Sequence, residues 1–239
     1  MKLQLALLVT VAIVGGVSAQ TVTVTPKKVT YKRPKPMEDY KKEFTITYPK
    51  IRAATPALSA KIERSLSYES VLHLRLKEEL TDSQWLEEAD FEVKYNKNGI
   101  LCLDESMDGT AAYPSGTSKI VCVDTRTGVR ARPADVFTNL AGLTAVVRKA
   151  QEAEKRKAIP QIKKDDPDVD QPELLFGDKH FVANDLDGYE VGDKGVTFHY
   201  DYEFPHVAEG LQPDGAYFYS WAQLRPYIKK GGLLTRVAR

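Results

Sequence analysis

The sequence of 239 residues is poor in the residues that build small disulfide or metal scaffolds, with two Cys and four His. Two cysteines form at most one disulfide, so a hydrophobic core has to stabilise the fold. An excess of one charge is also missing, because 34 Lys and Arg stand against 33 Asp and Glu. This balance gives no electrostatic reason to expect nucleic acid or an anionic membrane as the partner.

Long apolar runs are missing after the N-terminus, where one extends from Leu3 to Val14. A lysine precedes this run and small residues ending at Ala19 follow it, which is the pattern of a cleavable secretory signal peptide. The run is too short to span a membrane. We therefore expect residues 1–19 to be removed and the mature chain to be soluble and either secreted or periplasmic. Loss of Lys2 leaves 33 basic residues against 33 acidic ones.

Motifs that carry catalysis are also missing from the sequence. It contains no G-x-S-x-G, no H-E-x-x-H, no glycine-rich phosphate loop and no Walker motif. Asp166, Asp168 and Asp170 superficially resemble a calcium loop, but Gln171 stands where glycine is required and Gly177 where glutamate is required. The sequence thus predicts a protein that is not an enzyme and has no cofactor.

A group of metal-ligand residue types does occur near the C-terminal end. His199, Asp201 and Glu203 alternate along a predicted strand, and His206 follows closely. Alternate residues of a strand lie nearly 7 Å apart, so three in a row seldom reach one ion at about 2.1 Å. We interpret these residues as the solvated face of an amphipathic strand and predict no metal site.

The clearest structural signal is an alternating segment from Asp90 to Asp124 that turns at Asn98-Gly99, a typical hairpin sequence. A two-residue turn would pair Tyr95 with Cys102. A three-residue loop with a left-handed Gly99 would pair Tyr95 with Leu101 and Val93 with Leu103. The second register makes one continuous apolar face, and we predict it for that reason.

A third strand over residues 119–124 extends this unit. If Cys102 lies opposite Cys122, then Leu103 faces Val121 on the apolar side and both sulfurs share the other side. Opposed cysteines in an antiparallel pair are within reach of a disulfide. With the secretory signal, this favours a Cys102–Cys122 disulfide over two free, half-buried thiols.

The rest of the chain contains further predicted elements. The helix expected after Asn139 has a charged second half, residues 152–157, that we expect to project into water. In order, the elements are an extended arm over 20–42, whose prolines prevent long ladder pairing but which can add an edge strand, a strand over 44–48 stopped by Pro49, helical segments over 55–82 capped by Thr55, a helix from Asn139 that ends at Pro160, a polar linker over 163–173, a hairpin of 189–191 with 196–203, a strand over 217–219 and a short helix begun by a capping box at Ser220.

Aromatic residues provide the remaining signal for recognition. Such residues anchor binding surfaces, but on alternating strand positions they more often lie in the core with a satisfied hydroxyl. We favour the core for each of Tyr113, Tyr200, Tyr202, Tyr217, Tyr219 and Trp221.

Several segments resemble a family of domains of unknown function, found at the front of the peptidoglycan deacetylase PdaC and in the extracellular part of the anti-sigma factor RsiV. The match runs from about residue 43 to 230 in the right order. The segments are F-T-I-T-Y-P-K-I (44–51), E-V-K-Y-N-K-N-G-I (92–100), A-Y-P-S (112–115), T-R-T-G (125–128), A-D-V-F (134–137), D-K-G-V-T-F-H-Y-D-Y-E-F-P-H-V-A-E-G (193–210) and S-W-A-Q-L-R-P-Y-I (220–228).

The resemblance implies an α+β fold in which two sequence halves, 43–137 and 138–239, build one antiparallel sheet flanked by helices. These halves follow the signal peptide and the arm over 20–42. The resemblance also implies an exported receptor that binds lysozyme. The sequence shows no transmembrane helix and no deacetylase domain, so we expect the extracellular module alone. The balanced charge is an argument against a dedicated lysozyme trap, because an acidic partner steers a basic ligand best.

We therefore predict an exported, non-catalytic binding module with a protein ligand such as a lysozyme-like hydrolase. The expected contact surface is formed by the loop residues Tyr113, Pro114, Phe204 and His206. A module that binds cell-envelope glycan (peptidoglycan) is the alternative, and it predicts exposed aromatics along a groove. A hydrolase with an unrecognised site is the third possibility, and it predicts a concave pocket holding carboxyl groups with shifted pKa values.

Overall fold

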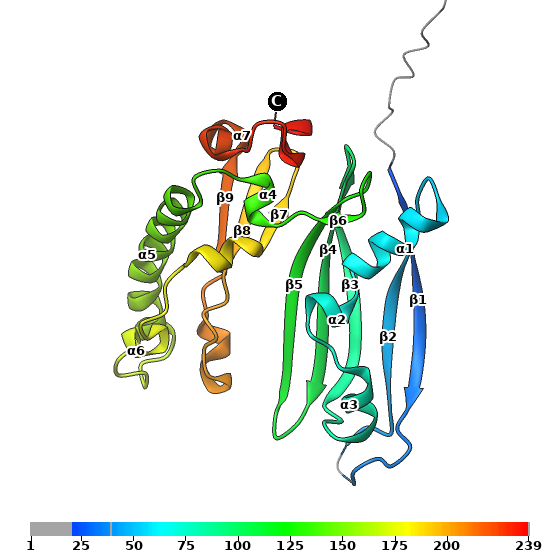
Figure 1. The fold of residues 1–239 in the computed structure, drawn as a ribbon. Helices are drawn as coiled ribbons and strands as arrows, with labels where there is room; N and C mark the ends of the chain where they lie inside the picture. Colours follow the sequence, from blue (N-terminus) through cyan, green and yellow to red (C-terminus); the bar gives the residue numbers. More distant parts are fainter. Residues whose placement is uncertain (1–20, 39, 239) are drawn as a thin grey trace, which may run out of the picture.

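The computed structural model describes residues 21–38 and 40–238 and has an α+β fold with two sheets flanked by helices (Figure 1). The predicted fold class is confirmed. The resemblance implied a single sheet, whereas the strands form one sheet of six and a second of three. The expected signal peptide, residues 1–19, lies outside the described residues.

The larger sheet follows chain order from β1 to β6, and the smaller sheet has the order β7-β8-β9. Neighbouring strands are antiparallel, except that β2 and β3 run parallel. The strands are β1 Thr23–Lys32, β2 Glu43–Arg52, β3 Leu86–Lys97, β4 Ile100–Thr110, β5 Pro114–Asp124, β6 Val129–Arg130, β7 Tyr189–Val191, β8 Gly195–His199 and β9 Ala216–Ser220.

Helices occur in three of the connections between these strands, after β2, β6 and β8, and one helix is long. None of the helices within 21–38 and 40–238 combines the length and apolar character needed to cross a membrane. The α-helices are α1 Pro56–Ser65, α2 Tyr68–Val71, α3 Leu76–Thr81, α4 Pro133–Val136, α5 Leu140–Asp165, α6 Glu173–Phe176 and α7 Trp221–Leu224, and the 3₁₀ helices are η1 Ala183–Asp187, η2 His206–Leu211, η3 Arg225–Tyr227 and η4 Leu233–Arg236.

The β3–β4 hairpin turns through two residues, Asn98 and Gly99, which both have left-handed backbones (φ 55° and 76°). The predicted three-residue loop is therefore wrong, and Tyr95 pairs with Cys102. Asn and Gly both tolerate positive φ, so the tight turn that matches the strand twist is accessible to this sequence. The extra residue lies further along β3, where a register shift between Val93 and Tyr95 restores the predicted pairing of Val93 with Leu103.

Replacing Gly99 with alanine is expected to lower the free energy of unfolding by about 2 kcal/mol, because φ is positive and the site is crowded. A Cβ atom there would lie 2.9 Å from Nη1 of Arg236. That guanidinium is held by Asp124 through bonds of 2.9 and 2.7 Å. Gly231→Ala is the matched control, since Gly231 also has a positive φ (72°) but open space around it. Equal losses for both variants in urea denaturation would contradict the role of Arg236.

The β4–β5 pair has the predicted register. Cys102 lies opposite Cys122 with their Cα atoms 4.0 Å apart, and the two residues form a disulfide. Leu103 lies opposite Val121, and both pack in the core that α1 covers on one face of the sheet. The opposite face, which holds the disulfide, belongs to a second core shared with the smaller sheet. The larger sheet is therefore buried on both faces at this point.

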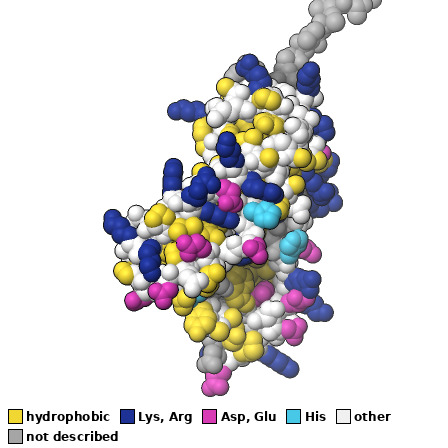
Figure 2. Space-filling view, turned by 90° about the vertical axis from the view of Figure 1, so that its left-hand side faces the viewer, with side chains coloured by type: hydrophobic (Ala, Val, Ile, Leu, Met, Phe, Trp, Pro, Cys, Tyr) yellow, Lys and Arg dark blue, Asp and Glu magenta, His cyan; other side chains and the backbone are white. Residues whose placement is uncertain are grey.

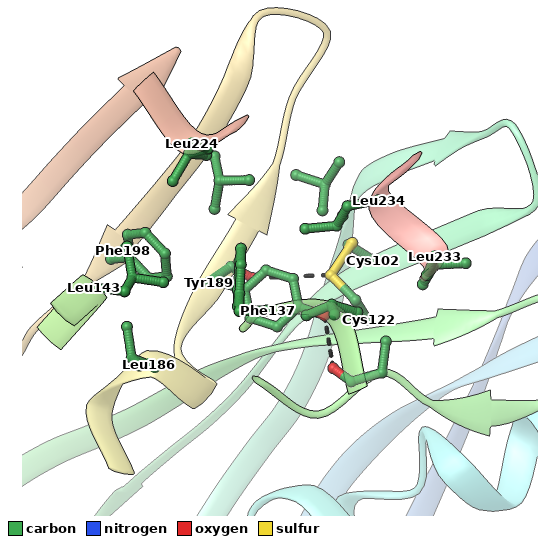
Figure 3. Packing of buried hydrophobic residues seen from close by; sticks show 14 of the residues in the cluster. Cys102, Cys122, Phe137, Leu143, Leu186, Tyr189, Phe198, Leu224, Leu233 and Leu234 are labelled. Atoms are coloured by element: carbon green, nitrogen blue, oxygen red, sulfur yellow. Dashed lines mark hydrogen bonds between the residues drawn. A yellow bond between two sulfur atoms is a disulfide. The ribbon is translucent and has the colours of Figure 1, made fainter. Parts of the chain in front are cut away.

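Figure 3 shows how the second core closes over the disulfide. The rings of Phe137 and Tyr189 and the side chains of Leu233 and Leu234 lie around the two cysteines. The hydroxyl of Tyr189 donates a hydrogen bond of 2.6 Å to the carbonyl of Ala131. Tyr189 and both leucines come from the second half of the sequence, so the halves form one continuous core.

Two strands run through prolines that the sequence analysis treats as stops. β1 pairs with β2 over ten residues, and Pro26 lies opposite Pro49. Two prolines can oppose each other only where the pair exchanges no hydrogen bonds, so neither missing N–H weakens this ladder. The parallel pairing of β2 with β3 covers only Thr45 and Ile46, so the other side of Pro49 has no partner in the sheet.

The helical predictions are partly correct. Thr55 caps α1 and Asn139 caps α5 through their side chains, as expected, and Ser220 forms the predicted capping box. The segment over 68–82 is broken at His73, which has a positive φ of 58°. Helix α5 does not end at Pro160 but continues to Asp165, into the predicted linker.

The second half of α5 is not wholly solvated. The carboxylate of Glu154 accepts hydrogen bonds from the hydroxyls of Tyr202 (2.8 Å) and Tyr217 (2.7 Å). The two hydroxyl oxygens lie 2.8 Å from each other. This arrangement fastens α5 to the segment between β8 and β9 and satisfies two buried tyrosines.

Candidate functional site

A polar cleft with a volume of about 850 Å³ lies between residues of the larger sheet and residues of the second half of the chain. One wall is formed by β4 and β5, and the other by η1, β7, β8 and the segment around η2. Nine of its 21 lining residues are acidic and two are lysines. The acidic residues are Asp104, Asp108, Asp185, Asp187, Glu190, Asp201, Glu203, Glu209 and Asp214.

Strand alternation places the acids of the first wall. Asp104, Ser106 and Asp108 occupy alternate positions of β4 and line the cleft, while Leu103 before them and Met107 between them are buried in the cores on the other face. On β5, Gly116 lies opposite Asp108. A Cβ atom there would lie 2.4 Å from Oδ1 of Asp108, so the glycine makes room for this carboxylate.

Two charged contacts lie in the cleft near Asp104. Its Oδ2 lies 3.9 Å from Nζ of Lys94, and Nε2 of His199 lies 3.2 Å from Oε2 of Glu190. The other oxygen of Asp104 is buried and has no hydrogen-bond partner among the described residues. Burial raises the pKa of Asp104, and the nearby charges of Lys94 and His199 only partly oppose this shift.

The second wall is joined to the first by ion pairs. One oxygen of Asp187 lies 3.0 Å from Nζ of Lys119 and 2.6 Å from Nη2 of Arg130. Asp185 accepts a hydrogen bond of 2.6 Å from the backbone of Val182, yet burial raises the pKa of its carboxyl group. The cleft is thus held by fixed contacts, and of its nine carboxylates Asp108 and Asp214 form no ion pair or side-chain hydrogen bond among the described residues.

Three of the four predicted binding residues lie at one end of this region. Tyr113 belongs to the β4–β5 turn, is 68% exposed and stacks on the ring of His206 with centroids 5.7 Å apart. Pro114 follows it and is exposed. Phe204 differs, because it is 7% exposed and packs against Phe176. Its side chain supports the loop that carries His206 and presents no surface to a ligand.

The residues considered as metal ligands each have another contact. His199 bonds to Glu190, Glu203 pairs with Lys179 at 2.6 Å, and His206 lies 3.2 Å from Glu209. Asp201 accepts a hydrogen bond of 2.7 Å from the backbone of Glu203. Within the described stretches no group of three or more His, Cys, Asp or Glu has the arrangement to hold a metal ion.

The other aromatic candidates lie mostly in the core. Tyr202, Tyr217 and Trp221 are buried, whereas Tyr200 and Tyr219 are half-buried. Tyr113 is the exception to the predicted core placement. Val207, next to its stacking partner His206, is 95% exposed, so an apolar rim lies beside the acidic cleft.

The acidic cleft is not predicted from the sequence. Its carboxylates come from segments as far apart as β4 and the residues after η2, and no local motif links them. Asp201 and Glu203 are exposed as predicted, but they do not belong to a strand, because β8 ends at His199 and Glu203 has a positive φ of 50°. The wall opposite them is not predictable without the fold. The alternation of Asp104, Ser106 and Asp108 is the one local signal for a polar face.

Comparison with known proteins identifies the fold. No protein-family model matches the chain, and no curated protein matches it in sequence. A DUF3298 family protein of Pseudomonas aeruginosa PAO1 has a similar structure, with a TM-score of 0.54 and 11% identity over 88% of this chain and 96% of that chain. A DUF3298 member from Bacteroides fragilis NCTC 9343 gives 0.52 and 10% over 91% and 98%. At this identity the likeness concerns the fold alone.

Proposed function

We propose that this chain is an exported, non-catalytic binding module whose acidic cleft receives a basic protein, with lysozyme-like hydrolases as the first candidates. The observation that carries the proposal is the gathering of nine carboxylates and two lysines in one cleft. The near-zero net charge of the whole chain conceals this local separation. Association is steered by the local potential at the site, so a balanced total charge does not argue against a basic ligand.

The rim of the cleft supports a protein ligand in particular. Tyr113 and Val207 are both largely exposed beside the acidic lining. An exposed aromatic next to charged groups is a common anchor in protein interfaces, where the charges orient the partner and the apolar contact provides affinity. The resemblance to the RsiV extracellular domain suggests a binding role of this kind, and the DUF3298 structures support only the fold.

Calorimetry of residues 20–239 with a chicken-type lysozyme, at low and at physiological salt, tests the proposal. We expect a sub-micromolar complex that weakens but persists at physiological salt. Heat that disappears entirely at physiological salt would indicate non-specific attraction. No heat at either salt would contradict the proposed ligand class.

Removing cleft charge is expected to slow the association with lysozyme. In Asp108→Asn/Asp214→Asn, one exposed carboxylate is neutralised on each wall. The association rate at low salt should fall about three- to tenfold, with a smaller dependence on salt. Glu69→Gln/Glu173→Gln is the matched control, because it removes the same charge from exposed residues outside the cleft. Equal rates for both double variants in stopped-flow experiments would contradict a role for the cleft.

The residues that line the cleft also distinguish between the two alternative functions, glycan binding and hydrolysis. A glycan groove would be lined with aromatic rings, and Tyr200 is the one Tyr, Trp or Phe among the lining residues found in the described chain. The raised pKa values of Asp104 and Asp185 instead favour a hydrolase as the second candidate. The test is whether the purified chain clears a peptidoglycan suspension. Clearing that is lost in Asp104→Asn would show that the chain is a hydrolase and not a binding module.

A further inference from the structure

A second pocket, of about 680 Å³, lies at the end of the molecule where α7 and the C-terminal segment meet (Figure 1). We call it the C-terminal pocket. It shares no lining residue with the acidic cleft. Its lining residues are Thr138, Trp221, Arg225, Pro226, Ile228, Lys229, Lys230, Thr235 and Ala238.

The charge of the C-terminal pocket is opposite to that of the cleft. Arg225, Lys229 and Lys230 line it, and none of its lining residues is acidic. Among the described residues, no ion pair joins any of these three cations to a carboxylate. On the face shown in Figure 2, Lys and Arg predominate at the upper end and Asp and Glu are more frequent in the lower half.

The backbone around the C-terminal pocket is fixed by contacts to the region around α4. Phe137 forms a β-bridge with Ile228, and the backbone N–H of Lys229 donates to the carbonyl of Val136 at 2.9 Å. Nζ of Lys229 donates to the carbonyl of Ala134, also at 2.9 Å. These contacts hold the segment 225–230 in place, so the cations do not have to be gathered when a ligand binds.

Four of the nine lining residues of the pocket are apolar. The indole of Trp221 is fixed by a hydrogen bond of 3.0 Å from Nε1 to the carbonyl of Asp193. Pro226 and Ile228 add aliphatic surface, and Thr138 and Thr235 carry hydroxyl groups. A pocket of this size that combines apolar surface with a small number of polar and charged groups is typical of small-molecule sites.

We infer that the C-terminal pocket binds a small organic anion. Arg225 and Lys230 hold its carboxylate or phosphate group, and its apolar body lies against Pro226, Ile228 and the edge of Trp221. The guanidinium offers paired donors that match either kind of oxyanion, and the ammonium adds a point charge. This site is independent of the proposed lysozyme binding, since neither requires a residue of the other.

The experiment follows the indole N–H signals in ¹H–¹⁵N NMR spectra of residues 20–239. The chain has two Trp, so Trp85 serves as an internal reference for Trp221. The probes are benzoate, phenyl phosphate and the neutral benzamide, which share a ring and differ in charge. We expect saturable shifts of the Trp221 indole and of the amides over 225–230 with one or both anions, no saturation with benzamide, and no shift of Trp85. Preference between the two anions distinguishes a carboxylate ligand from a phosphorylated one.

Two variants establish which side chains hold the anion. Arg225→Gln/Lys230→Gln should weaken binding at least tenfold, whereas Arg52→Gln/Lys77→Gln removes two exposed cations elsewhere and should leave it unchanged. An unperturbed Trp85 signal verifies that the double variant is folded. The single variant Lys230→Gln removes one of the two cations and should weaken binding less. Absence of saturation with both anions, equal binding of benzamide, or undiminished binding by the double variant would each overturn the inference.

Discussion

Raising the pH from about 4.5 to about 8 is expected to destabilise the folded chain by up to about 5 kcal/mol through one residue, Glu105. Its side chain lies on β4, is fully buried, and neither of its carboxyl oxygens has a hydrogen-bond partner among the described residues. Burial raises the pKa of Glu105 from 4.5 to about 8, with Arg130 opposing the shift and Asp104 adding to it. The folded chain therefore keeps a proton that the unfolded chain has already released.

The direction of this effect follows from the two pKa values. Below pH 4.5 the carboxyl group is neutral in both states, so the stability is unaffected. Between about 4.5 and 8 only the folded chain holds the proton, and the free energy of unfolding falls by about 1.4 kcal/mol per pH unit. Above about 8 both states are ionised and the loss is complete.

The variant Glu105→Gln isolates this contribution from other titrating groups. Glutamine has a similar shape and cannot ionise. The free energy of unfolding of the variant, relative to that of the natural chain, should therefore increase steadily between pH 4.5 and 8. Urea denaturation of both proteins across this range measures the difference directly. A constant difference would show that Glu105 does not retain a proton in the folded chain. Other groups that titrate equally in both proteins cancel in this comparison.

Loss of the Cys102–Cys122 disulfide is expected to lower the free energy of unfolding by about 3 kcal/mol. The two cysteines are 20 residues apart, and a cross-link of this length restricts the unfolded chain by about that amount. Both residues lie in the core between the sheets, at 0% and 2% exposure, so Cys102→Ala/Cys122→Ala also removes buried contacts. The double variant should therefore be at least as unstable as the reduced natural chain.

Urea denaturation with and without a reducing agent measures this contribution. The midpoint of the natural chain should fall on reduction, whereas the double alanine variant should be insensitive to the reducing agent. Because the disulfide is buried, its reduction under native conditions should be slow and limited by opening of the core. An unchanged midpoint after complete reduction would contradict the expected stabilisation.

The sequence predicts correctly those elements that a local pattern of residue types identifies. Alternation around Asn98-Gly99 identified the hairpin, and the opposed positions of Cys102 and Cys122 followed from the apolar face of the neighbouring strand. The details that failed depend on context beyond the local sequence. Nothing in residues 90–104 indicates that the bulge lies within β3 instead of at the turn. Helix α5 continues past Pro160, and Ile162 beyond it is buried in a cluster with residues of the second half that are distant in sequence.

The sequence predicts only part of the candidate site, because the rest depends on contacts between distant segments. Tyr113, Pro114 and His206 were chosen as loop residues, and the fold brings the rings of Tyr113 and His206 together although they are far apart in the sequence. Phe204 was indistinguishable from them in sequence, yet it is buried under η2. The acidic cleft is a product of tertiary structure, because its carboxylates are ordinary surface acids until two walls face each other.

The pairing of Pro26 with Pro49 restricts how another chain can attach to this protein. Because this pair exchanges no hydrogen bonds, the nitrogen of Pro26 faces the outer edge of β1, where it offers no donor to an incoming strand. Lys27 and Lys28 follow on the same edge strand and bring charge that an added strand would have to accommodate. Extension of the larger sheet by a partner's backbone is therefore disfavoured along β1, which protects the chain against edge-to-edge aggregation. A partner approaching β1 would therefore have to contact side chains instead of pairing with the backbone.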